Sequence, residues 1–204
     1  AELMYINLIS DETDSKDTVS ATRGLHFRSP VYELSGQIEF NFLPYDPGNP
    51  LYTWTPFVYA GASLFNFNPQ AENKIGDWVD LQPLGTEGQG TTLPKTDSKY
   101  SLIQFAAALG GGVKIAVNNT FNIIFEYSTR KTFTDYLDDV SGNYVSTTPT
   151  EWSDNPDAEY LSDPNNRDYP FGKERGNPDK QDWYSFAGVT LSFKLASKTK
   201  GCDF

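Results

Sequence analysis

The sequence predicts an all-β protein built from long antiparallel strands, and three observations support this fold class. The 204-residue chain contains 14 Phe, 12 Tyr and 4 Trp residues, and aromatic side chains are enriched in strands. It also contains 16 Gly and 13 Pro residues, which suits many turns between short elements. Several segments of ten or more residues alternate apolar and polar side chains with the period of two that a strand produces.

Six segments carry this signal and are the expected strands: 2–9, 31–43, 51–66, 101–117, 121–132 and 183–195. The clearest is VYELSGQIEFNF at 31–42, where the even positions are mostly apolar and the odd positions mostly polar. Segment 51–66 alternates poorly, and we expect Pro56 near its start or at a sheet edge because proline cannot donate to a ladder. The three glycines at 110–112 lie inside an expected strand, where they permit curvature or close packing.

The lengths of the connections add a topological signal. Long connections (10–30, 67–100 and 133–182) alternate with short turns (45–50 and 118–120). Outer-membrane barrels have short periplasmic turns and long extracellular loops. The sequence therefore predicts an antiparallel transmembrane β-barrel, and a soluble sandwich or lipocalin-like barrel is the alternative that the same alternation allows.

If the strands form a membrane barrel, their apolar faces are expected to contact lipid and their polar faces to line the lumen. Residues expected to face lipid are Leu34, Ile38, Phe40, Ile103, Phe105, Ile123, Phe125, Val189, Leu191 and Phe193. Residues expected in a lumen charge network are Glu33, Gln37, Glu39, Lys114, Glu126, Arg130 and Lys194. Aromatic residues near strand ends are expected at the two membrane interfaces, namely Tyr52, Trp54, Tyr100, Tyr136, Trp183 and Tyr184.

The domain organisation follows from the strand count. Because small bacterial barrels have at least about eight strands, we expect a further hairpin upstream of Ala1 that the six segments lack. Residues 1–195 are then one barrel domain, and residues 196–204 are a periplasmic tail that contains Cys202. No run of 18 apolar residues occurs, so no transmembrane helix is expected.

Composition argues against several classes of function. A net charge of -11 does not suit nucleic-acid binding, which needs clustered Lys and Arg. One His and one Cys cannot form a Cys/His zinc cluster or an internal disulfide. His26 is accompanied by no serine or cysteine elbow, and the glycine-rich stretch 83–92 lacks the Lys-Ser/Thr of a phosphate loop. We therefore expect no enzymatic activity, no cofactor and no small-molecule substrate.

The segment 133–182 is the most acidic part of the chain. It holds twelve acidic and four basic residues, and the pattern predicts one solvated loop. Within it, Asp135, Asp138 and Asp139 are a weak candidate for a Ca²⁺ site, since carboxylates are ligands that Ca²⁺ takes. Their spacing does not match an EF-hand, and a turn stabilised by an Asp side chain is the simpler interpretation.

Four segments and a strand pair resemble a known family. The segments are FNFNPQA (65–71), WVDLQPLGTEGQG (78–90), RKTFTDYLDDVSGNYV (130–145) and FAGVTLSFKL (186–195). With LHFRSPVYELSGQIEFNFLPY (25–45), they resemble in that order the outer-membrane barrel family that includes the PorG component of the type IX secretion system.

The resemblance implies a non-catalytic barrel in the outer membrane of a Gram-negative cell. It also implies contact with a periplasmic ring, made of a lipoprotein and its partner subunit, that serves protein secretion and gliding motility. Residues expected at that contact are Tyr45, Asp46, Asn118, Asn119, Lys198 and Lys200. The alternative function is a surface-exposed binding or adhesion barrel that uses the long acidic loops.

Overall fold

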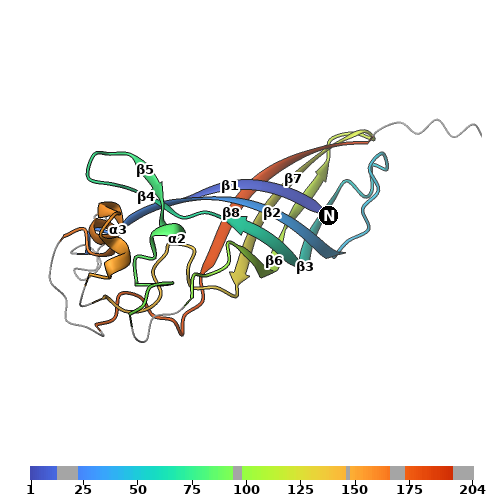
Figure 1. Cartoon of the computed structure of the whole chain (residues 1–204). Coiled ribbons are helices and arrows are strands. Elements are labelled where there is room, and N and C mark those ends of the chain that lie inside the picture. The colour runs from blue at the N-terminus through green and yellow to red at the C-terminus, as the bar shows by residue number, and fades with distance from the viewer. Residues whose placement is uncertain (13–22, 94–97, 146–147, 166–172, 195–204) are drawn as a thin grey trace, which may run out of the picture. The chain divides into compact units, whose positions relative to one another are not determined.

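The computed structural model describes residues 1–12, 23–93, 98–145, 148–165 and 173–194 (Figure 1). The chain divides into two compact units, and each is treated by itself. Unit 1 comprises Ala1–Ser35, Ser63–Ala106 and Lys131–Asp182, and unit 2 comprises Gly36–Ala62, Ala107–Arg130 and Trp183–Phe204.

The described residues contain six long strands, one for each segment that the sequence predicts. They are β1 (Glu2–Asp11), β2 (His26–Asn41), β3 (Trp54–Phe67), β6 (Ile103–Ala116), β7 (Phe121–Thr132) and β8 (Trp183–Phe193). Together with the short strands β4 (Gln70–Glu72) and β5 (Trp78–Asp80), they belong to one eight-stranded sheet with the order β5-β4-β2-β3-β6-β7-β8. Strand β1 pairs antiparallel with β2 from Glu2↔Ser35 to Asp11↔His26. The predicted all-β, mostly antiparallel fold class is therefore confirmed.

The local sequence explains the regular strands. The period of two gives each strand one apolar and one polar face, so slipping by one residue would exchange the faces. Pro56 occupies the third position of β3, as expected for a residue near the start of a strand. In the described part of the chain, no helix is long and apolar enough to cross a membrane.

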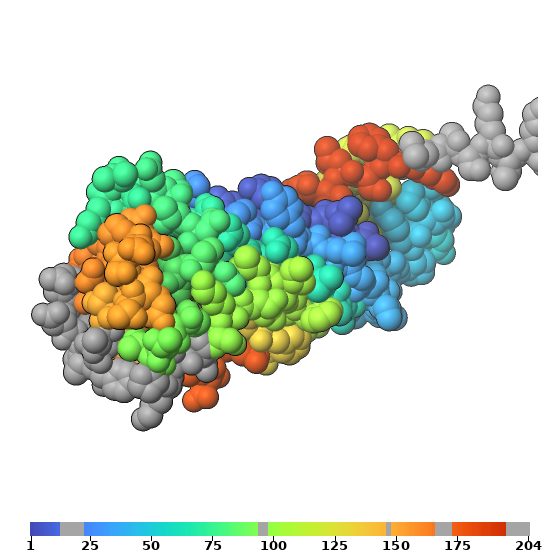
Figure 2. All heavy atoms as spheres, viewed as in Figure 1, coloured from blue at the N-terminus to red at the C-terminus, as the bar shows by residue number. Residues whose placement is uncertain are grey.

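The long connections of unit 1 fold into a small structure, which we call the loop cap and define as residues 70–92, 98–100, 133–145, 148–165 and 173–182. It contains β4, β5, α2 (Leu81–Leu84), the 3-10 turn η2 (Thr150–Trp152) and α3 (Pro156–Ser162). A hydrophobic cluster of Ala71, Leu81 and Leu161 is buried in it. Figure 2 shows α3, in orange, packed beside the preceding segments of this unit. The expectation of one solvated loop at 133–182 was wrong, because apolar side chains such as Trp152 and Leu161 are buried there.

The two short turns of unit 2 contact each other. The Tyr45 hydroxyl donates a hydrogen bond to the Asn122 carboxamide oxygen at 2.9 Å. A Cβ added to Gly48, whose φ is +107°, would lie 2.9 Å from the Asn119 Cβ. Turn 45–50 therefore packs against turn 118–120. Leu51, which follows turn 45–50, is exposed.

Candidate functional site: an inverted sheet and a loop cap

Every long strand exposes apolar side chains. The exposed fraction reaches 85% for Ile38 in β2 and 65% for Phe193 in β8. Most residues that we expected to face lipid are exposed, namely Leu34, Ile38, Phe40, Ile103, Phe105, Phe125, Val189, Leu191 and Phe193. Ile123 differs, since it is partly buried. The exposed side of the strands is thus apolar in both units.

The opposite side of the same strands buries polar groups. In unit 1, Glu33 is 3% exposed and stands beside buried Ser29 and Ser35 along β2. In unit 2, Arg130 is fully buried in β7, together with Ser128. The buried side also carries apolar residues such as Phe57 and Phe65, and the two buried charges have partners, as fully buried charged residues almost always do.

The interior of unit 2 is organised around Ser128. Its hydroxyl accepts hydrogen bonds from the Tyr59 hydroxyl, at 2.6 Å, and from the Arg130 guanidinium, and it donates to the Leu109 carbonyl oxygen at 3.2 Å. The guanidinium carbon of Arg130 also lies 5.2 Å from the centre of the Phe186 ring. Side chains therefore fill this space, and the buried cation is held by hydrogen bonds and an aromatic face.

The glycines of β6 make room for this packing. A Cβ at Gly110 would lie 2.4 Å from the Tyr59 ring, and one at Gly112 would lie 1.9 Å from the Phe125 carbonyl oxygen. The Gly112 contact is with backbone, so glycine is required there, whereas a side chain at Gly110 would have to displace the Tyr59 ring. The close packing expected for the three glycines is present.

The predicted lumen charges form separate contacts. Lys114 pairs with Glu39, and its ammonium also lies 4.9 Å from the centre of the Phe57 ring. The Thr190 hydroxyl donates to the Glu126 carboxylate at 3.5 Å. Gln37 is partly buried, whereas Lys194 is exposed at the end of β8, where its amide donates to the Thr120 carbonyl oxygen at 2.8 Å.

The loop cap contains a buried ion pair that sequence reasoning missed. The Arg175 guanidinium lies 3.1 Å from the Glu87 carboxylate, and both side chains are buried. Glu87 also accepts hydrogen bonds from the amides of Ser141, at 3.0 Å, and Gly142, at 2.8 Å. Arg175 donates to the carbonyl oxygens of Asp139 and Leu161 at 2.6 and 3.3 Å. These contacts join three segments that are far apart in the chain.

The Asp139 side chain is a second point in the cap where separate segments are joined by hydrogen bonds. Asp139 is fully buried, and its backbone adopts a left-handed φ of +64°, a conformation that Asp tolerates better than most residues. Its carboxylate accepts hydrogen bonds from the Thr86 hydroxyl and, at 2.7 Å, from the Tyr100 hydroxyl. Burial, followed by the Asp139 charge, raises the pKa of Tyr100 far above its ordinary value, so this phenol stays neutral.

Tyr100 is also the middle ring of an aromatic stack. Its ring centre lies 6.1 Å from that of Phe67 and 4.4 Å from that of Tyr136, with interplanar angles of 9° and 12°. Tyr100 and Tyr136, which we expected near a membrane interface, are partly buried and stack on each other within the cap, so their placement at an interface stays a prediction. Tyr184 is buried as well, whereas Tyr52, Trp54 and Trp183 are exposed.

Several acidic side chains near this ion pair have pKa values above the ordinary value for Asp. Burial raises the pKa of Asp135 to about 7 and that of Asp138 to about 8. Burial also raises the pKa of Asp139 to about 6, against the lowering effect of Arg175. For Asp182, burial raises the pKa, while a hydrogen bond from the Leu137 amide opposes the shift.

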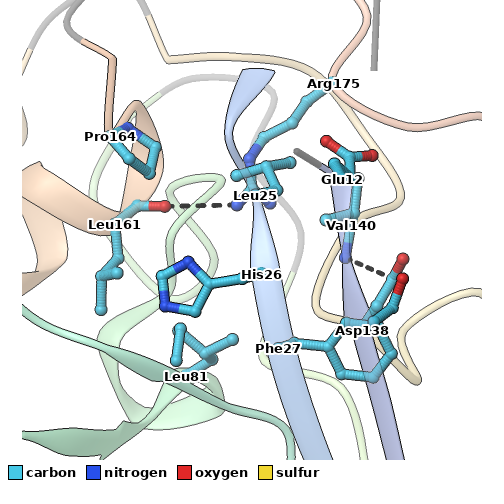
Figure 3. A pocket seen from close by; sticks show the side chains of 12 residues that line it. Glu12, Leu25, His26, Phe27, Leu81, Asp138, Val140, Leu161, Pro164 and Arg175 are labelled. Carbon is cyan, nitrogen blue, oxygen red and sulfur yellow. Dashed lines mark hydrogen bonds between the residues drawn. The ribbon is translucent and has the colours of Figure 1, made fainter. Parts of the chain in front are cut away.

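A cavity of about 50 Å³ lies within unit 1, where the loop cap meets β2 (Figure 3). Its polar lining includes Glu12, His26, Asp138 and Arg175, and its apolar lining includes Leu81 and Leu161. The His26 imidazole Nε2 accepts a hydrogen bond from the Glu72 amide at 3.0 Å, so His26 holds β4 in place. The Arg175 Nε–H has no hydrogen-bond partner among the described residues.

The predicted Ca²⁺ ligands are not arranged as a metal site. Asp139 is occupied by Thr86 and Tyr100, and Asp138 accepts the Val140 amide at 3.0 Å, as expected for a turn stabilised by an Asp side chain. Among the residues with a described position, no group of three His, Cys, Asp or Glu side chains is placed to hold a metal ion.

Four of the six residues expected at a periplasmic partner have described positions. Tyr45, Asp46, Asn118 and Asn119 are in the paired turns of unit 2. Lys198, Lys200 and Cys202 fall outside the described residues.

A family described as a domain of unknown function (DUF6089) matches residues 1–82, which include β1 to β5. No curated protein and no solved structure matches the chain.

Proposed function

We propose that this protein is an integral, non-catalytic β-barrel of the outer membrane. In this proposal it is an anchor or scaffold of the type IX protein secretion and gliding motility machinery. One observation carries the membrane part: the strands expose apolar residues such as Ile38 and bury charged residues such as Arg130.

The physical argument concerns the solvent on each side of the strands. Water penalises large contiguous apolar surfaces, and monomeric soluble proteins rarely expose them. Lipid favours the same surface, while the polar side is stabilised by internal partners such as the Tyr59–Ser128 hydrogen bond. Backbone hydrogen bonding between strands also meets the requirement that a bilayer places on every N–H and C=O group.

The secretion role is supported by the sequence resemblance and by the form of unit 2. Turn 45–50 is held by hydrogen bonds between Asp46, Asn49 and Tyr52, and it presents Leu51 with 81% of its surface exposed. A rigid turn with an exposed apolar side chain is a suitable contact for a periplasmic ring, because little conformational freedom is lost on binding.

Membrane integration is tested by reconstitution. The purified chain is refolded with lipid vesicles and floated on a density gradient, with carbonate washing to remove peripheral protein. We expect the protein to remain with the vesicles after the wash. Recovery in the soluble fraction as a folded monomer would contradict the proposal and favour the soluble-barrel alternative.

The partner is tested by purification from the native outer membrane in mild detergent, followed by mass spectrometry of the co-purifying proteins. Leu51→Asp and Ile75→Asp form a matched pair, since each wild-type side chain is 81% exposed and the two lie in different turns. The anchor role predicts that Leu51→Asp reduces recovery of a ring lipoprotein and its partner subunit, and that Ile75→Asp does not. A wild-type barrel recovered alone, from membranes rich in ring proteins, would contradict the anchor role.

A second candidate is a surface-exposed binding barrel. It is favoured by the ordered structure of the loop cap, where the Glu87–Arg175 pair and the Ala71–Leu81–Leu161 cluster organise the long loops. The β4–β5 turn presents Ile75 from this cap. Adhesion to a surface or glycan that is lost in Ile75→Asp and retained in Leu51→Asp would support this candidate.

A further inference from the structure

We propose that the cavity in unit 1 is a binding site for a small neutral amide, with the size and chemistry of an acetamido group. Neither of the proposed functions assigns a ligand to this cavity, and the site does not depend on the membrane assignment. Two of the lining residues, Arg175 and His26, carry the N–H groups that a ligand would meet. Figure 3 shows both side chains next to Leu161.

Arg175 provides the first N–H donor. Its Nη1 donates to the Glu87 carboxylate and to the Asp139 carbonyl oxygen, and its Nη2 donates to the Leu161 carbonyl oxygen. Arg175 is 3% exposed, and its buried Nε–H has no hydrogen-bond partner in the part of the chain that the structure describes. A buried donor without an acceptor is costly, so an acceptor atom in the cavity gains a hydrogen bond there.

His26 provides the second N–H donor. Its Nε2 accepts a hydrogen bond from the Glu72 amide at 3.0 Å, so the neutral imidazole carries its proton on Nδ1. No residue with a described position accepts a hydrogen bond from that Nδ1–H. The ring is held edge-on to Trp78, with ring centres 6.1 Å apart. A carbonyl oxygen has two lone pairs, and it is the acceptor that suits two N–H donors in one small space.

The charges around the cavity favour a neutral ligand. The Arg175 guanidinium is paired with Glu87, and the Glu12 carboxylate, which also lines the cavity, is paired with Arg23. A carboxylate or phosphate would therefore add an unbalanced negative charge to a largely buried space, which is costly. A cation would meet the two N–H donors and the charge of Arg175.

The size and the remaining lining limit the ligand further. A volume of about 50 Å³ holds roughly three to five water-sized positions, so a ligand of about four non-hydrogen atoms fits. Ala71, Leu81 and Leu161 form a buried apolar wall that suits a methyl group. Asp138 keeps one carboxyl oxygen as an acceptor, because the hydrogen bond from the Val140 amide uses the other. An acetamido group combines the carbonyl oxygen, the methyl group and the N–H that this lining requires.

The acetamido group has two possible sources, a free small amide and an N-acetylated sugar. The apolar wall and Arg175 are buried, whereas Ser10 is exposed and Glu12 and Pro164 are partly exposed. This exposed side of the lining is the way in for a group attached to a larger molecule. The chemistry inside the cavity is the same for both sources.

The first test is an NMR titration of the folded, ¹⁵N-labelled full chain with acetamide. The Arg175 Nε–H and His26 Nδ1–H signals report the two donors directly. We expect both to shift saturably, with a dissociation constant on the order of 1 mM, because so small a ligand makes few contacts. The Nε–H signal of Arg130, which is buried in unit 2, should not move. Unchanged Arg175 and His26 signals at roughly 100 mM acetamide would overturn the proposal.

Acetate and urea are matched probes, since both have the planar shape and the number of non-hydrogen atoms of acetamide. Acetate replaces the amide nitrogen by a charged oxygen, and urea replaces the methyl group by a second amino group. We expect each to bind at least about tenfold more weakly than acetamide, because acetate buries a charge and urea places a polar group on the apolar wall. Acetate that binds as tightly as acetamide would contradict a neutral ligand.

N-acetylglucosamine and glucosamine distinguish the two sources. Shifts of the Arg175 and His26 signals with N-acetylglucosamine, and none with glucosamine, would assign the site to an acetamido group carried by a sugar. Shifts with acetamide and with neither sugar would assign it to a free small amide. Equal shifts with the two sugars would contradict recognition of the acetamido group.

Ala71→Val and Ala106→Val form a matched pair of variants. Both alanines are buried in strands of unit 1, and Ala71 lines the cavity whereas Ala106 does not. The larger side chain at position 71 takes up part of the cavity, so we expect affinity for acetamide to fall by at least about tenfold, with no change in Ala106→Val. Wild-type affinity in folded Ala71→Val would overturn the site. If that variant does not fold, the probe series on the wild-type chain decides the question.

Discussion

The Glu87 carboxylate and the Arg175 guanidinium form a buried ion pair, 3.1 Å apart, although 88 residues separate them in the sequence. The pair is reinforced on both sides, since Glu87 also accepts two backbone amides and Arg175 donates to two carbonyl oxygens. It is one of the contacts that hold the two long connections of unit 1, 67–100 and 133–182, to each other.

Glu87→Ala should destabilise the loop cap by about 3–5 kcal/mol, because it leaves Arg175 as an uncompensated buried charge. The Ser141 and Gly142 amides also lose their acceptor. Denaturant unfolding, followed by tryptophan fluorescence, to which buried Trp152 contributes, measures the change. Glu174→Ala is the matched control, as Glu174 is exposed and its loss should change the free energy of unfolding by no more than about 0.5 kcal/mol.

The double variant Glu87→Ala with Arg175→Met separates pairing from packing. Removing both charges should recover part of the loss in the single variant, because replacing a buried ion pair by apolar side chains is often neutral. Additive effects of the two substitutions would show that the ion pair carries no coupling energy.

Gly112→Ala should disrupt the pairing of β6 with β7. The new Cβ would lie 1.9 Å from the Phe125 carbonyl oxygen, and backbone cannot yield as a flexible side chain can. We expect a loss of about 3 kcal/mol, at the upper end of the usual cost of overpacking, or failure to fold. Gly36→Ala is the control, since nothing lies within 4 Å of the position that a Cβ would take there. Equal stability of the two variants would contradict the close approach at Gly112.

Leu109→Lys should impair membrane assembly. Leu109 is exposed at the middle of β6, so in the proposed membrane orientation a cation there would cost about 2–4 kcal/mol. Leu51→Lys places the same charge on an exposed side chain in the short turn, where the cost near an interface is about 0–1 kcal/mol. Vesicle flotation of both variants gives the comparison, and equal insertion would refute the lipid-facing assignment of β6.

Tyr59→Phe should lower the stability of unit 2 by about 1 kcal/mol, the usual net contribution of one hydrogen bond. The lost hydroxyl donates to Ser128, which also accepts from Arg130. Combining Tyr59→Phe with Ser128→Ala in a double-mutant cycle measures the coupling. A coupling energy of zero would mean that Tyr59 contributes through its ring alone.

The long strands could be predicted from the sequence because each carries its own periodic signal. The predicted segment 121–132 coincides with β7, and the 31–42 pattern places Glu33 on the buried face and Leu34 on the exposed face. The Gly110–Gly112 run also predicted close packing. It did not show that the side chain packed against Gly110 is Tyr59. Local patterns define a strand and its faces but not the partner on the next strand.

The loop cap could not be predicted in the same way. Leu81, Trp152 and Leu161 lie in short stretches in which apolar residues do not recur with a sustained strand period, so no periodic signal predicted their burial. The acidity of 133–182 suggested solvation, yet Asp139 is buried because Tyr100 and Thr86, from another connection, supply its hydrogen bonds. Arg175 is one of four basic residues in 133–182, so nothing in the sequence marked it out, and its partner is fixed only by the tertiary fold.

The stacked rings of Phe67, Tyr100 and Tyr136 give the loop cap an optical signature of its own. Nearly parallel rings at 4.4 Å, as in Tyr100 and Tyr136, couple their electronic transitions and produce circular dichroism in the near ultraviolet. The hydrogen bond from the Tyr100 hydroxyl to Asp139 ties that signal to the acidic centre of the cap. Tyr100→Phe and Tyr136→Phe would therefore isolate the part of the near-ultraviolet signal that reports the folded state of the loops, because other aromatic pairs such as Tyr5 and Tyr32 contribute as well.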